Sequence, residues 1–247
     1  MALAMWEKWY RQVKQESVNY TRSIVSYLDI LGFSSLVETK KPGKISRILR
    51  ILGESVEPHP TDEPAEIIFT RFSDTIIRSI PVPSPLFFIY ELKTILRAQI
   101  ALIPEGVIIR GAVTVGDIVQ SWDVVYGPAV VRAYQLESPE GGFPRIIIDN
   151  EALKLLRPAW NREELRQFGA VKEEDSTIYL DYLRGCEVEL HQEYPHFLAI
   201  HRDFIRDSLI KHANNPKVLP KYEWLKVYHE HTLQERFGDD IPQDLRF

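Results

Sequence analysis

The chain contains short runs that are rich in apolar and β-branched residues and are bounded by glycine, proline or charged residues. Runs of about five to ten such residues are typical of strands in a folded sheet. We therefore predict strands at residues 23–30, 67–72, 75–80, 106–115, 117–125, 145–149 and 176–183.

Other segments repeat their apolar residues every three or four positions, which is the period of an amphipathic helix. In one of them Phe88, Leu92 and Ile95 share a single stripe, and in another Pro128 occupies a first helical turn, where proline is well tolerated. The predicted helices are residues 34–38, 43–55, 84–102, 127–137, 151–156, 196–211 and 222–237.

Two pairs of neighbouring strands are predicted to form hairpins. Ser73 and Asp74 separate the strands of the first pair, and Val115, Gly116 and Asp117 separate those of the second. Serine, aspartate and glycine are common turn residues. Asp74 is therefore expected in a turn at the end of a sheet.

The order of these elements predicts an α+β fold, ferredoxin-like or palm-like, in which helices flank a largely antiparallel sheet. Beyond about residue 190 the pattern is helical only. We divide the chain into an N-terminal helical segment (1–19), a central α+β domain (20–185) and a C-terminal helical extension (186–247).

The composition narrows the class of protein. With 247 residues, 45% apolar and 26% charged, the chain has an ordinary globular composition. It lacks the roughly 20 apolar residues of a membrane span and the pattern of a signal peptide, so we expect a cytoplasmic protein that does not bind membranes. The single cysteine, Cys186, excludes an internal disulfide, and the net charge of −5 disfavours a nucleic-acid partner.

Asp29 and Asp74 are the main candidate functional residues, because each follows a strand-like run. If the two strands lie side by side, both carboxylates meet at one edge of the sheet. Carboxylate oxygens are ligands that hard divalent cations prefer. Taken singly, Asp29 could equally cap the helix that follows and Asp74 could equally stabilise its turn.

Four blocks of the sequence, in family order, resemble the catalytic domain of class III nucleotide cyclases across roughly residues 20–185. They are residues 29–34, 72–74, 109–116 and 126–138. The forms Ser-Asp-Thr, Arg-Gly-Ala-Val-Thr-Val-Gly-Asp and Tyr-Gly-Pro-Ala are most similar to the bacterial pyrimidine cyclases of the Pycsar antiphage systems. The resemblance implies a class III cyclase fold and the formation of 3′,5′-cyclic UMP and pyrophosphate from UTP, or of cyclic CMP from CTP.

The resemblance also implies two Mn²⁺ or Mg²⁺ ions in each site, held by Asp29, Asp74 and the backbone carbonyl of Ile30. Metal contact with both the attacking and the leaving oxygen favours attack of the 3′-hydroxyl on the α-phosphorus. The backbone N–H groups of a turn that enters a helix can cradle phosphate oxygens. That turn consists of Leu31, Gly32, Phe33 and Ser34.

Some positions depart from the family pattern. Purine cyclases carry a base-reading lysine four residues before the second metal aspartate, where this chain has Thr70 with Arg71 beside it. A threonine hydroxyl can both donate and accept a hydrogen bond, which suits the edge of a pyrimidine, although Thr70 could equally serve strand packing.

Val131 and Gln135 stand where the family has a catalytic asparagine and a transition-state arginine. Arg132 lies near the Gln135 face of the same predicted helix and is the candidate replacement, with a solvated surface arginine as the alternative. Lys172 is a candidate contact for the triphosphate, with a plain surface lysine as the favoured alternative.

In the family the site lies between two subunits, so we expect a homodimer with composite sites and a product that acts on a separate effector protein in antiphage defence. A degenerate cyclase that only senses nucleotide is a second hypothesis. An RNA- or protein-binding ferredoxin-like module is a third, which the acidic charge balance disfavours.

Overall fold

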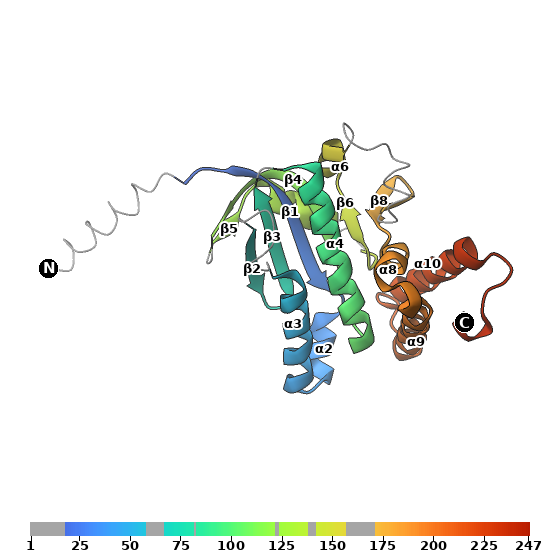
Figure 1. Cartoon of the computed structure of the whole chain (residues 1–247). Coiled ribbons are helices and arrows are strands. Elements are labelled where there is room, and N and C mark those ends of the chain that lie inside the picture. The colour runs from blue at the N-terminus through green and yellow to red at the C-terminus, as the bar shows by residue number, and fades with distance from the viewer. Residues whose placement is uncertain (1–17, 58–66, 82, 122–123, 138–141, 157–170) are drawn as a thin grey trace.

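The computed structural model describes residues 18–57, 67–81, 83–121, 124–137, 142–156 and 171–247 (Figure 1). The predicted segment 1–19 lies almost entirely outside these residues. The strands are β1 (Thr21–Ile30), β2 (Ile68–Phe72), β3 (Thr75–Pro81), β4 (Ile109–Gln120), β5 (Val125–Tyr126), β6 (Ile146–Ile148), β7 (Val171–Glu174) and β8 (Thr177–Leu180). The helices are α2 (Phe33–Thr39), α3 (Pro42–Val56), α4 (Pro85–Leu102), α5 (Pro128–Glu137), α6 (Asn150–Leu156), α8 (Tyr182–Leu190), α9 (Tyr194–His212) and α10 (Leu219–Phe237), with short 3₁₀ turns η1 (Ile103–Glu105), η2 (His191–Glu193) and η3 (Gln243–Leu245).

The described strands form one sheet in the order β2-β3-β1-β4-β6-β8-β7, with β5 added to β4. Within the described residues every neighbouring pair is antiparallel except β4 and β6, which run parallel. The predicted α+β class with a largely antiparallel sheet is therefore confirmed, and β1 lies in its interior.

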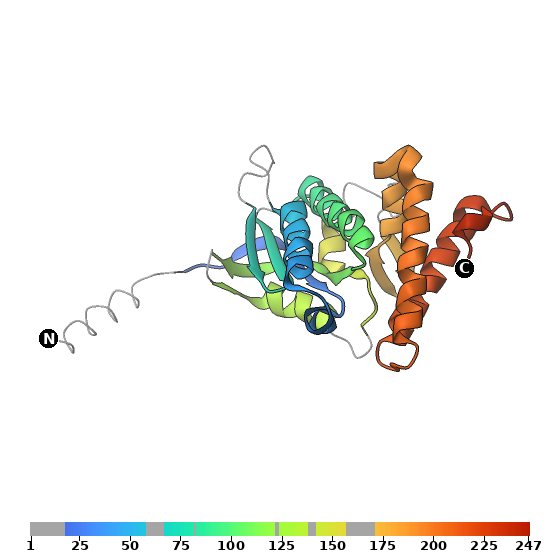
Figure 2. The ribbon, with the colours of Figure 1, turned by 90° about the horizontal axis from the view of Figure 1, so that it is seen from below.

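Helices cover both faces of the sheet. In Figure 2, α3 and α4 lie on one face and α5 lies on the other. Alternate residues of β1 serve the two sides: Ile24 and Leu28 belong to the main apolar cluster, whereas Val25 contacts the smaller cluster with Ile118 and Ala129. This two-residue alternation is the burial pattern expected for a strand with both faces covered.

The C-terminal helices α8, α9 and α10 lie beside the β8 end of the sheet and the nearby end of α4 (Figure 1). Their buried side chains, such as Leu198 and Leu225, join the same apolar cluster as Ile24 of β1. The predicted division near residue 186 falls inside α8. No helix among the described residues has both the length and the hydropathy needed to cross a membrane.

The predicted turn at residues 115–117 is wrong, because β4 runs without interruption from Ile109 to Gln120. Its whole length as far as Ile118 pairs with β1, and this pairing keeps the strand extended through Gly116. A Cβ added at Gly116 would lie 3.2 Å from the Cβ of Ala129. The glycine therefore makes room for α5 and does not reverse the chain.

The predicted strand 176–183 is also too long. β8 ends at Leu180, and the side chain of Asp181 accepts a hydrogen bond from the backbone N–H of Arg184, which caps α8. Its partner β7 was not predicted, since the residues Val-Lys-Glu-Glu carry only one apolar side chain. Pairing with β8 imposes the extended form on this segment.

We predict that Gly111→Ala destabilises the protein by about 3 kcal/mol or more. An added Cβ would lie 2.0 Å from the carbonyl oxygen of Tyr27 in β1, so the two strands would have to separate. Urea unfolding followed by circular dichroism measures the effect.

Gly43→Ala in α3 is the matched control, because no atom lies within 4 Å of an added Cβ there. It should change stability by no more than about 1 kcal/mol. Equal unfolding midpoints for the two variants would contradict the importance of the close contact between β1 and β4.

Candidate active site

Asp29 lies at the end of β1, directly opposite Arg110 of β4. Its carboxylate is 16% exposed. One oxygen, Oδ2, accepts hydrogen bonds from Nη2 and Nε of Arg110 at 3.2 and 3.4 Å, and the other, Oδ1, accepts one from the Thr75 hydroxyl at 3.4 Å. The two neighbouring strands therefore hold the carboxylate in one orientation.

Asp74 lies in the tight turn between β2 and β3, where Ser73 has a left-handed φ of 58°. The turn brings the Asp74 carboxyl within hydrogen-bonding reach of Asp29, and partial burial together with the Asp29 charge raises the pKa of Asp74 to about 6. The structure thus brings together the two carboxylates that the sequence pattern pairs. In the absence of a cation they repel each other unless one is protonated.

This donor set fits a hard divalent cation. Among the described residues there is no group of three or more histidine, cysteine or acidic side chains that could hold a metal. Mg²⁺ is commonly bound by only one or two carboxylates, together with water and the phosphates of a substrate. Asp29 and Asp74 match that pattern, with the Ile30 carbonyl as the predicted further ligand.

The predicted phosphate-binding turn follows β1 directly. Gly32 has a left-handed φ of 73°, and α2 begins at Phe33. The N–H of Leu31 donates to the carbonyl of Ile108 at 3.0 Å, so this N–H is already engaged. The N–H groups at Phe33 and Ser34 in the first turn of α2 remain the predicted phosphate donors.

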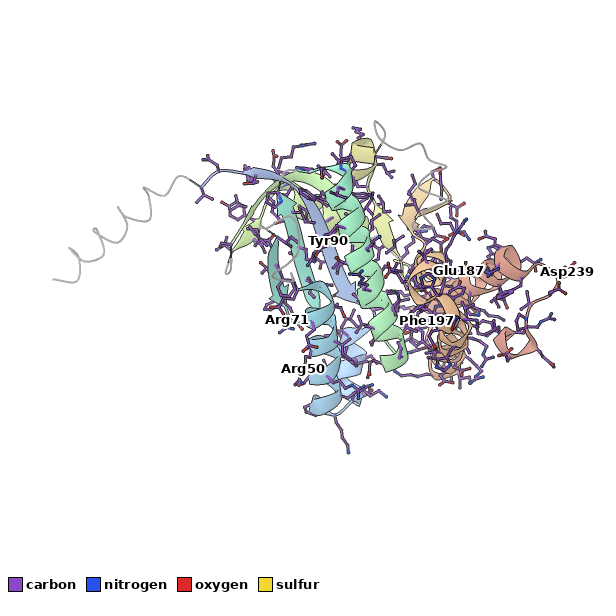
Figure 3. All side chains as sticks on the ribbon, in the orientation of Figure 1. Arg50, Arg71, Tyr90, Glu187, Phe197 and Asp239 are labelled. Atoms are coloured by element: carbon purple, nitrogen blue, oxygen red, sulfur yellow. The ribbon has the colours of Figure 1, made fainter. Side chains whose placement is uncertain are left out.

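Thr70 and Arg71 both have partners within the chain. The Thr70 hydroxyl accepts from the Gln120 amide at 2.9 Å and donates to the carbonyl of Ser121 at 3.3 Å. Arg71 donates to the carbonyl of Leu49 in α3 at 3.1 Å, and Figure 3 shows it beside that helix. Base reading at Thr70 stays a prediction, and the structure adds Gln120 as its partner.

Arg132 in α5 forms a bidentate ion pair with Asp149, at 2.9 and 3.1 Å. Burial favours a raised pKa for Asp149, but hydrogen bonds from Arg132 and from Thr114 outweigh burial and lower it. Within one chain Arg132 therefore neutralises the buried carboxylate of Asp149. The same carboxylate accepts a hydrogen bond from Thr114, which lies on β4 four residues after Arg110. Its predicted catalytic role stays untested.

Lys172 is not brought near the aspartate pair. It lies on β7, which is separated from β1 by β4, β6 and β8. Its ammonium group pairs with Glu235 of α10 at 3.3 Å and lies over the ring of Tyr228. A contact between Lys172 and phosphates bound at Asp29 of the same chain has no support in this placement.

Three charged residues near Asp29 were missed by sequence reasoning. Arg110 also pairs with Glu137 at the end of α5, at 2.8 Å. Lys221 of α10 lies within electrostatic range of Arg110 and Glu137. Burial and the charge of Arg110 lower the pKa of Lys221, while the charge of Glu137 raises it. A single arginine in the apolar run before Gly111 could have indicated Arg110, whereas nothing in the sequence indicates that Lys221 lies nearby.

No family model and no curated protein matches this chain. Among solved structures it is similar to the guanylyl cyclase Cya2, with 16% identity and a TM-score of 0.45 over 67% of this chain and 93% of that one. It is also similar to a bacterial light-regulated adenylyl cyclase, with 13% identity and a TM-score of 0.48 over 78% of this chain and 68% of that one. A third is the monomeric guanylyl cyclase domain of the RhoGC fusion protein from the aquatic fungus Blastocladiella emersonii, with 12% identity and a TM-score of 0.45 over 65% of this chain and 94% of that one. At these identities the likeness concerns the fold alone.

We predict that Asp74→Asn removes a pH-dependent loss of folding stability from the metal-free protein. The pKa of Asp74 rises from 3.8 to about 6 on folding, so the folded state holds this proton more tightly than the unfolded state. The contribution of Asp74 to stability therefore falls as the pH rises from about 4 to about 6. Thermal unfolding should be measured in EDTA at several pH values. The unfolding temperature of the variant should rise relative to that of the wild type as the pH increases across this range.

Mn²⁺ at pH 7.5 should raise the unfolding temperature of the wild type, because a bound cation removes the repulsion and favours the folded state. Asp74→Asn should lose this response. Asp117→Asn, which alters an exposed carboxylate on β4, should keep it. An equal Mn²⁺ response in the wild type and Asp74→Asn would contradict the metal assignment.

Proposed function

We propose that this protein is a nucleotide cyclase, which converts a nucleoside triphosphate into a 3′,5′-cyclic monophosphate and pyrophosphate. The observation that carries the proposal is the convergence of Asp29 and Asp74 at the end of β1 and the β2–β3 turn. The two aspartates, the turn after β1 and the start of α5 all lie within the sequence blocks that resemble cyclases.

The side chains around Asp29 suit this reaction. When bound, divalent ions would supply positive charge to the attacking and leaving oxygens of the nucleotide. Arg110 and Thr75 fix both oxygens of Asp29, so the carboxylate can meet a ligand without reorienting. Glu137 holds the other side of Arg110 and thereby fixes the arginine. The site is thus built to position the reacting groups.

We further propose a pyrimidine substrate, UTP ahead of CTP. Thr70 replaces a purine-reading lysine, and its hydroxyl is joined to the Gln120 amide. An amide and a hydroxyl together present both donors and acceptors, which match the polar edge of a pyrimidine. The preference for UTP, and a role for its product on a separate effector in antiphage defence, follow from the Pycsar resemblance.

A homodimer is part of this proposal. Exposed apolar side chains lie next to the aspartate turn and along α5: Phe72 is 83% exposed, Val131 55% and Tyr134 53%. Exposed groups of this kind are common where a second subunit binds. In such a dimer Arg132 of one subunit would serve the aspartate pair of the other.

A degenerate cyclase that binds nucleotide without turnover is the second candidate. The engagement of Arg132 by Asp149 favours it, because Asp149 neutralises the guanidinium charge and occupies its Nε and Nη2 groups, which leaves fewer N–H donors and less net charge for a phosphate. The two candidates predict the same binding and differ in turnover.

We predict that the purified protein with Mn²⁺ forms a cyclic monophosphate from UTP, or from CTP, faster than from ATP or GTP. Mass spectrometry of the products identifies it. Asp74→Asn should reduce turnover by at least about a hundredfold, as expected for the loss of a metal ligand, and Asp117→Asn should retain it. Nucleotide-dependent thermal stabilisation without any product would favour the degenerate sensor.

Mixing two inactive variants tests the composite site. In random dimers of Asp74→Asn with Arg132→Gln, half of the dimers contain one intact site of two, so about a quarter of wild-type activity should return. Asp74→Asn mixed with the double variant should remain inactive. Full activity of Arg132→Gln alone, at an unchanged unfolding temperature, would remove Arg132 from the mechanism.

A further inference from the structure

A cleft of about 450 Å³ lies between the central domain and the C-terminal helices. One wall comes from the turn after β1, with Leu31 and Gly32, and from α2 and α3. The opposite wall comes from α9, α10 and the segment between them. Two of the four residues predicted to bind phosphate therefore face the C-terminal extension across this cleft.

The cleft is rich in positive charge, although the chain as a whole carries −5. Its lining contains four lysines and two acidic residues: Lys40, Lys44, Lys211, Lys221, Glu105 and Asp207. Glu105 is engaged by Lys44 and by Arg47. Lys40, Lys211 and Lys221 have no ion pair among the described residues, so their charges are available to a ligand.

Lys221 is the informative member of this set because it is partly buried. Burial disfavours its charged form, and the charge of Glu137 offsets this only in part, because burial and the charge of Arg110 together lower the pKa of Lys221. It also lies near Arg110 and Glu137, and Arg110 contacts Asp29. The extension thus contributes to the cleft a cation that is within electrostatic range of Arg110, the ion-pair partner of Asp29.

The aromatic wall suits the same kind of ligand. Tyr222 of α10 and His212 of α9 stack with ring centres 5.4 Å apart and an interplanar angle of 5°. Burial and the charge of the neighbouring Lys211 lower the pKa of His212, and its imidazole ring can donate a hydrogen bond in either protonation state. The cleft therefore combines compact cations with a rigid polar surface.

We propose that this cleft binds a polyphosphate chain and that Lys211 and Lys221 of the C-terminal extension are its principal cationic contacts. The geometry makes the extension one wall of a ligand site in addition to a packing partner. Identification of the polyphosphate as the triphosphate of a nucleotide rests on the proposed cyclase function. The proposal that the cleft binds free polyphosphate does not depend on that function.

Titration calorimetry of the full chain with sodium tripolyphosphate in EDTA tests the binding. Lys211→Gln and Lys221→Gln should each weaken binding about tenfold, as expected for the loss of one charge-assisted contact. Lys221→Arg should retain most of the affinity. Lys217→Gln is the matched control, because it removes an exposed lysine between α9 and α10 that does not line the cleft.

The absence of tripolyphosphate binding would overturn the proposal, as would equal affinities in Lys217→Gln and in the two cleft variants. Unfolding temperatures close to wild type verify that each variant is folded. Lys211 is exposed, so its substitution tests the cleft even if Lys221→Gln proves unstable.

A competition arm identifies the source of the polyphosphate. In Asp74→Asn, UTP should displace tripolyphosphate whereas uridine should not, and Lys221→Gln in the otherwise native chain should raise KM more than it lowers kcat. Failure of UTP to compete would overturn assignment of the cleft to the substrate. Lysine-dependent tripolyphosphate binding by a protein that makes no cyclic product would refute the cyclase function and leave this site standing.

Discussion

The antiparallel pairing of β1 with β4 is the constraint on which the candidate site depends. It runs over ten residue pairs, from Thr21 opposite Ile118 to Ile30 opposite Ile109. Near its end Gly111 allows the backbone to approach the carbonyl of Tyr27 more closely than any side chain would permit. This register sets Arg110 opposite Asp29, and a slip of one residue between the strands would place the two side chains on opposite faces of the sheet.

Acidic and basic side chains occupy separate regions around the paired end of β1 and β4. The acidic pair lies where β1 meets the β2–β3 turn, and Arg110 joins it to Glu137 of α5. On the side of the turn after β1, lysines of α9 and α10 face the cleft. A ligand with a metal-bound end and an anionic tail would satisfy both regions, because the cations balance the phosphates that the carboxylates alone would repel.

Sequence patterns were sufficient for the parts of the fold that are determined locally. The β2–β3 hairpin, its turn at Asp74, and the helices α3, α4, α9 and α10 follow from periodicity and turn residues within single segments. The convergence of Asp29 with Asp74 arose by another route than direct strand pairing. β3 lies between β1 and β2, and the β2–β3 turn that carries Asp74 leads directly into β3, the neighbour of β1. The turn expected at Gly116 failed because a glycine that makes room for a helix looks the same in a sequence as one that reverses a strand.

The chain alone therefore decides that there is an α+β sheet with two aspartates at its edge, since short-range signals encode strands, turns and their order. Only the folded protein decides which charges surround them. Arg132 is held by Asp149, Lys172 by Glu235, and Lys221 lies near Arg110, from which it is separated by more than a hundred residues. These partners depend on how α5 and the C-terminal helices pack on the sheet. The sequence around a charged residue does not identify the distant residue with which it will pair.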